Sequence, residues 1–362
     1  MKFLHCADLH LGCVGGQERM RAFERMLDFC KKEGVSVLLI AGDLFEAVRA
    51  DERTRRRVFD LLAGNPTLCT MIAAGNHDPL CAGGNYDGSL PGNVYVFGHD
   101  WSCAEIPAYG VRVWGASFAA ASEKPFAPDR KKRKLTPGLY DLGVLHGDLV
   151  SPGGRSDYRA VTKQSIAQTG LKYLALGHIH ERSTVRRAGD TLYAYSGCLQ
   201  GLGYDEIGEK GAYLGEVDEN GQLNMSFVKL CGSMTLEENV NLNGCADLAE
   251  AAGRCEKALE GKQGHRVLLT LTGTTRGFSV DENGLLRLLS GCGAKIRIED
   301  ETRPETDAAG IAQENTLRGA FARRMLRRIA ELEQSGQDAA AAREALQLGL
   351  NAFDGEVTRH AD

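Results

Sequence analysis

The sequence predicts an α/β protein with a layered first domain, followed by a smaller α+β domain and a helical tail. Short apolar runs recur through the first 230 residues, and each ends in a small or polar turn. Between several of them, apolar residues recur every three or four positions, as at Met20, Phe23, Leu27 and Cys30. Strands that alternate with amphipathic helices are typical of layered α/β domains with a largely buried sheet.

The first domain is expected to span residues 1–230. Its expected strands are, in chain order, KFLHCAD, VSVLLIAGD, CTMIAAGNHD, VYVFG, VRVWGAS, YDLGVLHGD, YLALGH and TLYAYSG. A helix from Arg19 to Lys32 is expected between the first two. The stretch GAYLGEVDENGQLNMSFVKL then predicts a β-hairpin about Asn220-Gly221, because Asn-Gly favours the tight turns between antiparallel strands. This hairpin closes the domain.

A compact α+β domain is expected over residues 231–305. It begins with a helix from Asp247 to Glu260 that Gly261 stops, and a short helix is expected near Leu285 to Leu289. The flanking strands are HRVLLTLTG and AKIRIED.

The remaining residues, 306–362, are expected to form a helical C-terminal segment after a linker, TRPETDAAG, at 302–310. An apolar stripe is expected along the helix, at Leu317, Phe321, Met325, Ile329 and Leu332. This stripe could pack on the protein itself or on a partner.

Composition is that of a globular protein, with 43% hydrophobic and 25% charged residues. No apolar run approaches the length of a membrane span and Met1 to Asp8 is strand-like, so we expect a cytoplasmic protein with no signal peptide. The 11 cysteines are scattered, with no C-x-x-C pair, which argues against a disulfide framework and a thiolate zinc site.

A formal net charge of -5 offers no global attraction to nucleic acid, so such contact would depend on local basic patches. The candidates are Arg53 with Arg55 to Arg57, RKKRK at 130–134, and Arg323, Arg324, Arg327 and Arg328. Each could equally be an ordinary solvated face.

Polar residues of particular types fall at the carboxyl ends of the expected strands, where loops of α/β sheets form ligand sites. They are Asp8, His10, Asp43, Asn76, His77, Asp78, His146, His178 and His180. His178 and His180 are two residues apart, so in an extended chain their side chains share a face. Carboxylates, an amide oxygen and imidazoles without thiolate suit Mn²⁺, Fe²⁺ or Zn²⁺. All of these residues except His77 and Asp78 are counted as donors, and these seven are enough for two ions bridged by a carboxylate, the usual arrangement for in-line phosphoryl displacement.

The ordered series Asp8-x-His10, Gly42-Asp43, Gly75-Asn76-His77-Asp78, His146 and Gly177-His178-x-His180 resembles the motifs of the calcineurin-like metallophosphoesterase superfamily. DLHLG, AGDLF, GNHD and ALGHIH, followed by SGCLQGLGYDEIGEKG, further resemble bacterial DNA repair exonucleases of the SbcD and YhaO type, relatives of the nuclease subunit of the Mre/Rad complex. The resemblance covers the first 230 residues closely. It implies a four-layer β-sandwich flanked by helices.

The resemblance also implies the roles of the site residues. One of two divalent ions, with Mn²⁺ expected first, would be held by Asp8, His10, Asp43 and His180. The other would be held by Asp43, Asn76, His146 and His178, which makes Asp43 the bridge. His77 would stabilise developing charge or protonate the leaving oxygen, and Asp78 would orient His77.

The function implied is a nuclease for DNA repair and recombination, with double-strand exonuclease and single-strand endonuclease activity. Its partners would be DNA, an SbcC-type coiled-coil ATPase docked on the helical tail, and a second copy in a homodimer. Glu46 departs from the pattern, because several family members have a histidine there that is thought to orient DNA. His5 and His99 are interpreted as structural.

Two other functions remain open at this point. One is a phosphodiesterase or phosphatase for small nucleotides or phosphoproteins on the same scaffold. The other is a non-catalytic DNA-end scaffold, which would be expected to lack ligands. No residue of the expected ligand set is missing.

Overall fold

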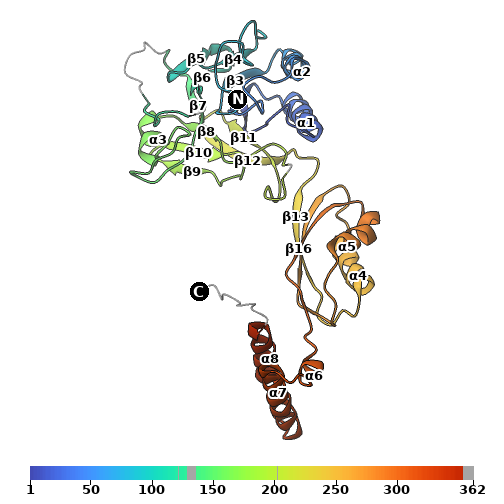
Figure 1. Cartoon of the computed structure of the whole chain (residues 1–362). Coiled ribbons are helices and arrows are strands. Elements are labelled where there is room, and N and C mark those ends of the chain that lie inside the picture. Colours follow the sequence, from blue (N-terminus) through green and yellow to red (C-terminus); the bar gives the residue numbers. More distant parts are fainter. Residues whose placement is uncertain (121, 129–135, 202, 354–362) are drawn as a thin grey trace. The chain divides into compact units, whose positions relative to one another are not determined.

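The computed structural model describes residues 1–120, 122–128, 136–201 and 203–353. The chain divides into two compact units, Met1–Leu236 and Glu237–Asp362 (Figure 1). The first unit carries all the expected site residues.

Two six-stranded sheets form the centre of the first unit. The first sheet has the order β12-β11-β1-β2-β3-β4 and the second the order β5-β6-β7-β8-β10-β9. The strands of the first are β1 (Lys2–Cys6), β2 (Val37–Ala41), β3 (Cys69–Ala73), β4 (Val94–Val96), β11 (Gly211–Val217) and β12 (Leu223–Lys229). Those of the second are β5 (Ser102–Ile106), β6 (Val111–Ala116), β7 (Tyr140–His146), β8 (Tyr173–Gly177), β9 (Arg186–Ala188) and β10 (Thr191–Tyr195).

The two sheets pack face to face and helices cover their outer faces. Phe3 and Leu39 of the first sheet share one buried cluster with Val144 of the second. Helices α1 (Gln17–Glu33) and α2 (Glu52–Ala63) cover the outer face of the first sheet, and α3 (Lys163–Thr169) covers that of the second (Figure 1). The predicted four-layer sandwich is therefore confirmed.

Local sequence explains the boundaries of these helices. Apolar side chains such as Phe23 and Met26 line the buried face of α1, which ends at Gly34 in the left-handed conformation. The carboxylate of Asp51 accepts a hydrogen bond from the N–H of Thr54 and caps α2. A short 3-10 helix, η1 (Pro107–Tyr109), precedes β6.

The second unit contains a small sheet packed against helices and, after it, a helical hairpin. Its elements are β13 (Thr235–Asn241), α4 (Leu248–Leu259), β14 (Arg266–Thr272), β15 (Thr274–Thr275), α5 (Glu282–Leu288), η2 (Leu289–Cys292), β16 (Lys295–Asp300), β17 (Arg303–Pro304), α6 (Ala308–Ile311), α7 (Leu317–Gln334) and α8 (Ala340–Phe353). A three-stranded sheet, β13-β14-β16, packs against α4 and α5.

The tail differs in detail from the expected single stripe. Helices α7 and α8 pack on each other, with Ala322 and Ile329 buried against Leu346 and Leu350, whereas Leu317 is exposed. The expected linker contains β17, which pairs with β15, and the first residues of α6. These elements are two to four residues long, which is too short for a periodic pattern of apolar residues to predict them from the sequence. No described helix is long and apolar enough to cross a membrane.

Candidate metal centre

The expected ligands come together at the ends of parallel strands. Asp8 and His10 follow β1 and Asp43 follows its parallel neighbour β2. The two loops are joined by backbone hydrogen bonds, since the N–H of Asp8 donates to the oxygen of Gly42 (3.1 Å) and that of His10 to the oxygen of Asp43 (2.9 Å). His146 ends β7 in the second sheet, so both sheets contribute to one site.

Backbone strain is concentrated in the same residues. Asp8, His10, Asp43 and His178 have φ values of 54°, 47°, 50° and 105°, and among the described residues only one other non-glycine, Arg159, has a positive φ. A side chain in this region costs on the order of 1–3 kcal/mol, so it persists only where the surrounding structure imposes it. The fold therefore holds these four side chains in fixed directions at a cost in stability.

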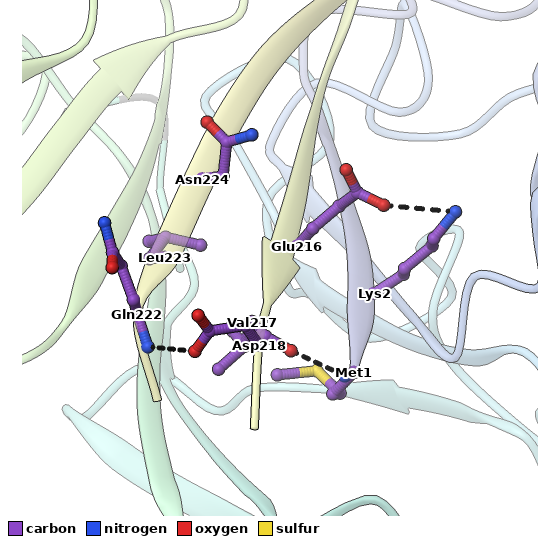
Figure 2. Close-up of a pocket in the computed structure, with 8 residues that line it drawn as sticks. All are labelled: Met1, Lys2, Glu216, Val217, Asp218, Gln222, Leu223 and Asn224. Atoms are coloured by element: carbon purple, nitrogen blue, oxygen red, sulfur yellow. Dashed lines mark hydrogen bonds and ion pairs between the residues drawn. The ribbon is translucent and has the colours of Figure 1, made fainter. Parts of the chain in front are cut away.

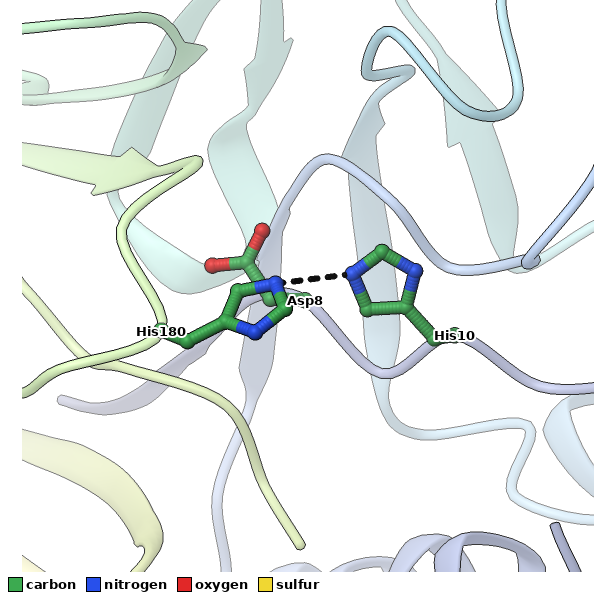
Figure 3. A group of neighbouring side chains, drawn as sticks. All are labelled: Asp8, His10 and His180. Carbon is green, nitrogen blue, oxygen red and sulfur yellow. Dashed lines mark hydrogen bonds between the residues drawn. The ribbon is translucent and has the colours of Figure 1, made fainter. Parts of the chain in front are cut away.

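One group of donors comprises Asp8, His10 and His180 (Figure 3). Their ligand atoms lie within 4.8 Å of one another, and the Nε2 atoms of His10 and His180 are 3.0 Å apart. Two nitrogens bound to one ion at about 2.1 Å each, with an angle near 90°, are separated by about 3 Å. The spacing of the two imidazoles fits a shared ion.

A second group comprises Asp8, Asp43 and His146. The Nε2 atom of His146 is 3.4 Å from Oδ2 of Asp43 and 2.9 Å from Oδ1 of Asn76. The same Asp43 oxygen is 3.8 Å from Nε2 of His10. Asp43 therefore lies between the two groups, as a bridging ligand would.

His178 is fixed beside the second group. Its backbone N–H is 3.1 Å from each carboxylate oxygen of Asp8, and its ring centroid is 5.2 Å from that of His146. The ring of Tyr158 packs against it at 4.7 Å. Coordination of an ion by the His178 ring stays a prediction.

The hydrogen bonds around the imidazoles indicate whether the site can bind cations. Nδ1 of His146 lies 2.9 Å from the carbonyl oxygen of Ala41, which can only accept, so Nδ1 carries a proton and Nε2 is the nitrogen left to face the site. Nε2 faces the oxygens of Asn76 and Asp43. Oxygens that converge on an imidazole nitrogen in this way fit a bound cation, and imidazole, carboxylate and amide donors suit a divalent metal.

Burial and neighbouring charges keep most of these ligands in the protonation state that binds metal. Burial lowers the pKa of His10 to about 3 and that of His178 to about 4, so both imidazoles are neutral at pH 7. Burial also acts to raise the pKa of Asp43, but His146 and His10 lower it below its ordinary value. Burial raises the pKa of Asp8 to about 6, which a neighbouring cation would reverse.

His180 differs from the other imidazoles. Its hydrogen bond to the carboxylate of Glu206 raises the pKa of His180, because the carboxylate stabilises the imidazolium. A proton on Nε2 of His180 can then occupy the space between the two facing nitrogens, which a metal ion would displace.

His77 and Asp78 follow the ligand Asn76 but face different surroundings. The His77 side chain is 42% exposed, and its Nδ1 is 3.2 Å from the carbonyl oxygen of Glu46. Asp78 is fully buried and accepts hydrogen bonds from the N–H groups of Phe45 and Gly75 and from the hydroxyl of Tyr86. Asp78 thus orients the backbone of the loop that carries His77, which differs from the expected bond to the imidazole. A catalytic role for either residue stays a prediction.

Three charged residues around the ligands were not foreseen as part of the site. Arg19 is buried at one end of α1, Glu206 lies in the loop before β11, and Glu46 was noted only as a departure from a motif. No local pattern marks these residues in the sequence, and only the burial of Arg19 in the structure shows that it has partners, because arginine is almost never buried without one.

Other candidate features lie away from these donors. A surface hollow of about 590 Å³ is formed at the amino end of β1 by Met1, Lys2 and the β11–β12 hairpin (Figure 2). Asp8 follows the opposite end of this strand. Of the basic patches, RKKRK at 130–134 lies outside the described residues, whereas the arginines on α2 and α7 are described. His5 is fully buried between Tyr173 and the oxygen of Leu176, and Nδ1 of His99 lies 3.3 Å from a carboxylate oxygen of Glu123.

Comparison with known proteins agrees with this architecture. Residues 1–182, half of the chain, match the calcineurin-like phosphoesterase family, and the chain belongs to that family.

Its relatives include an uncharacterized metallophosphoesterase, a DNA double-strand break repair protein and a subunit of a nuclease. The chain is 28% identical to the uncharacterized metallophosphoesterase YhaO of Bacillus subtilis over 249 residues, 63% of this chain and 60% of that protein. It is 31% identical to the DNA double-strand break repair protein Mre11 of Aeropyrum pernix over 240 residues, 59% of this chain and 57% of that protein. It is 24% identical to the SbcD component of the nuclease SbcCD of Bacillus subtilis over 250 residues, 58% of this chain and 64% of that protein. The chain thus spans less than two thirds of each of these relatives.

Proposed function

We propose that this phosphoesterase is a DNA nuclease that hydrolyses phosphodiester bonds with two divalent ions and acts in DNA repair. The observation that carries the proposal is the pair of donor groups joined through Asp43, in which Nε2 of His10 faces Nε2 of His180 and Nε2 of His146 faces the Asp43 carboxylate. DNA as the substrate is supported by the names of the relatives, a break-repair protein and a component of a nuclease.

Within this proposal the ligands hold two ions in the arrangement expected from the sequence. Asp8, His10 and His180 hold the first, while Asn76, His146 and His178 hold the second, with Asp43 shared. Divalent ions there, Mn²⁺ first and Fe²⁺ or Zn²⁺ as alternatives, would supply Lewis acidity at the phosphate and activate water. The other residues of the site would bind and orient the substrate and transfer protons.

His77 is the residue best placed for proton transfer. Its backbone N–H donates to Oδ1 of Asp43 (2.9 Å), and its Nδ1–H is aimed at the oxygen of Glu46, which leaves Nε2 available to a substrate. In the protonated state, Nε2–H would donate to the leaving oxygen or to the developing charge on phosphorus. Its exposure makes this possible without a change in the fold.

An ATPase is proposed as the partner of the helical hairpin. Arg323, Arg324, Arg327 and Arg328 are exposed on α7. Their charge would suit an acidic surface of a coiled-coil ATPase of the SbcC type, or DNA itself. Homodimerisation remains part of the proposal through the resemblance alone.

The test compares substrates and one variant. Protein stripped of metal and reloaded with Mn²⁺ should cleave linear double-stranded and single-stranded DNA, alone or with its ATPase. It should turn over a cyclic nucleotide or phosphopeptide slowly. His77→Ala should lower the cleavage rate by about 100-fold or more while Mn²⁺ stoichiometry by calorimetry is unchanged.

The matched control is His99→Ala, which removes an exposed imidazole from the same unit and should leave the rate unchanged. Absence of DNA cleavage under all these conditions would refute the nuclease, and fast turnover of a small nucleotide would favour the alternative phosphodiesterase. Unchanged cleavage by His77→Ala would remove His77 from the mechanism.

A further inference from the structure

Three charged side chains from distant segments meet behind the first donor group. Arg19 lies near the start of α1, Glu46 lies after β2, and Glu206 lies between β10 and β11. The Arg19 guanidinium is 3.7 Å from Oε2 of Glu46 and 3.8 Å from Oε1 of Glu206. Its Nε–H also donates to the carbonyl oxygen of Gln200 (3.2 Å). We name Glu46, Arg19 and Glu206 the outer triad.

Each glutamate of the outer triad contacts the Nδ1 atom of one imidazole. Oε1 of Glu206 is 2.9 Å from Nδ1 of His180, and Oε2 of Glu46 is 3.0 Å from Nδ1 of His10. An ionised carboxylate can only accept, so the hydrogen bond to Glu206 favours the neutral His180 tautomer with its proton on Nδ1. In that tautomer Nε2 of His180 offers a lone pair toward Nε2 of His10, which is 3.0 Å away.

The two contacts differ in strength. Glu206 is well enclosed, with a side chain 10% exposed, and its other oxygen accepts the N–H of Gly203 (2.9 Å). The Glu46 side chain is 40% exposed, and its contact with His10 is close in distance but not aligned as a hydrogen bond. Water can substitute for the Glu46 carboxylate more easily than for that of Glu206.

We infer that Glu206 is a positioning residue for the first metal site, which fixes the ring and tautomer of His180, and that Arg19 holds Glu206 and Glu46 in place as their shared counter-charge. Carboxylates that orient a ligating imidazole in this way typically change metal affinity by about 10- to 100-fold. The inference rests on the metal site of the proposed function but does not depend on DNA as the substrate.

The experiment measures Mn²⁺ binding by calorimetry on metal-free protein. Glu206→Gln keeps the shape of the side chain and removes its charge, and it should weaken one of two Mn²⁺ sites by about tenfold or more. Glu46→Gln should weaken the same site by a smaller factor. The control is Glu209→Gln, which makes the same change three residues away, where the carboxylate pairs with Lys229 (3.6 Å) on the surface. Its Mn²⁺ affinities should match those of the wild type.

A second measurement needs only the wild-type protein and covers the case that Glu206→Gln does not fold. Long-range ¹⁵N–¹H NMR at about pH 9, where the ordinary imidazole is neutral, should show His180 with its proton on Nδ1. A proton on Nε2, or two Mn²⁺ sites of unchanged affinity in a folded Glu206→Gln, would overturn the inference. Wild type that binds no Mn²⁺ would overturn it together with the proposed function. Loss of one site in Glu206→Gln, from a wild type that binds two ions but cleaves no DNA, would support the inference and refute only the nuclease.

Discussion

The close approach of Gly42 to His146 allows a sharp test of how the second donor group is built. Gly42 has φ +91°, and a Cβ added there would lie 2.1 Å from Nδ1 of His146. The ring cannot retreat easily, because it is fully buried, bonded to the oxygen of Ala41 and packed on Phe118. Gly42→Ala should therefore strain the backbone by about 1–3 kcal/mol and break a buried hydrogen bond that contributes about 1–3 kcal/mol. The expected loss in the free energy of unfolding is about 2–6 kcal/mol.

A matched control separates the clash from the backbone cost. Gly34 also has a positive φ, +67°, but a Cβ there meets nothing within 4 Å, so Gly34→Ala should lose only about 1–2 kcal/mol. Urea unfolding followed by tryptophan fluorescence reports on the first unit, since both tryptophans, Trp101 and Trp114, belong to it. Calorimetry should show one Mn²⁺ site lost in Gly42→Ala and both kept in Gly34→Ala. Equal destabilisation by the two variants, with both Mn²⁺ sites kept, would refute this account of His146.

Two further predictions concern histidines, the first His178 and His180 of the site and the second the buried His5 of β1. His178→Ala and His180→Ala should each weaken a different Mn²⁺ site, so calorimetry that shows the same site weakened in both would contradict the assignment. Burial lowers the pKa of His5 in the folded state to about 3, whereas its ordinary pKa in the unfolded chain is about 6.5. As the pH falls from 6.5 toward 3, the unfolded state therefore binds a proton at His5 that the folded state excludes. This group should cost about 2 kcal/mol of stability between pH 8 and pH 5, and His5→Gln should remove that share of the pH dependence of urea unfolding; an unchanged dependence would argue against it.

The positions of the ligands were predictable because they depend on local pattern. Each expected ligand follows or ends an apolar run, and parallel strands bring such positions to one edge regardless of what lies between them. The strands β5 and β9 were not predicted, since their side chains are largely polar or exposed and they lie at sheet edges. A strand that is buried on neither face has no alternation of apolar and polar side chains by which it could be predicted.

The outer triad shows where prediction from sequence stops. Arg19, Glu46 and Glu206 are separated by 27 and 160 positions in the chain and share no period, so their meeting depends on the packing of α1 and two loops. Each residue alone fits an ordinary solvated charge. Only burial of the guanidinium between two carboxylates distinguishes them, and burial is a property of the fold.

The same contacts connect metal affinity with stability. Positive φ values at four ligands and the raised pKa of Asp8 oppose folding of the metal-free chain. A cation bound beside Asp8 would stabilise its carboxylate, so part of the binding free energy of that cation would appear as stability of the first unit. At a free Mn²⁺ concentration 100 times the dissociation constant this amounts to about 2.7 kcal/mol per ion. A site that is held rigid at a cost to the fold is thereby ready for its ions, because little rearrangement remains when they bind.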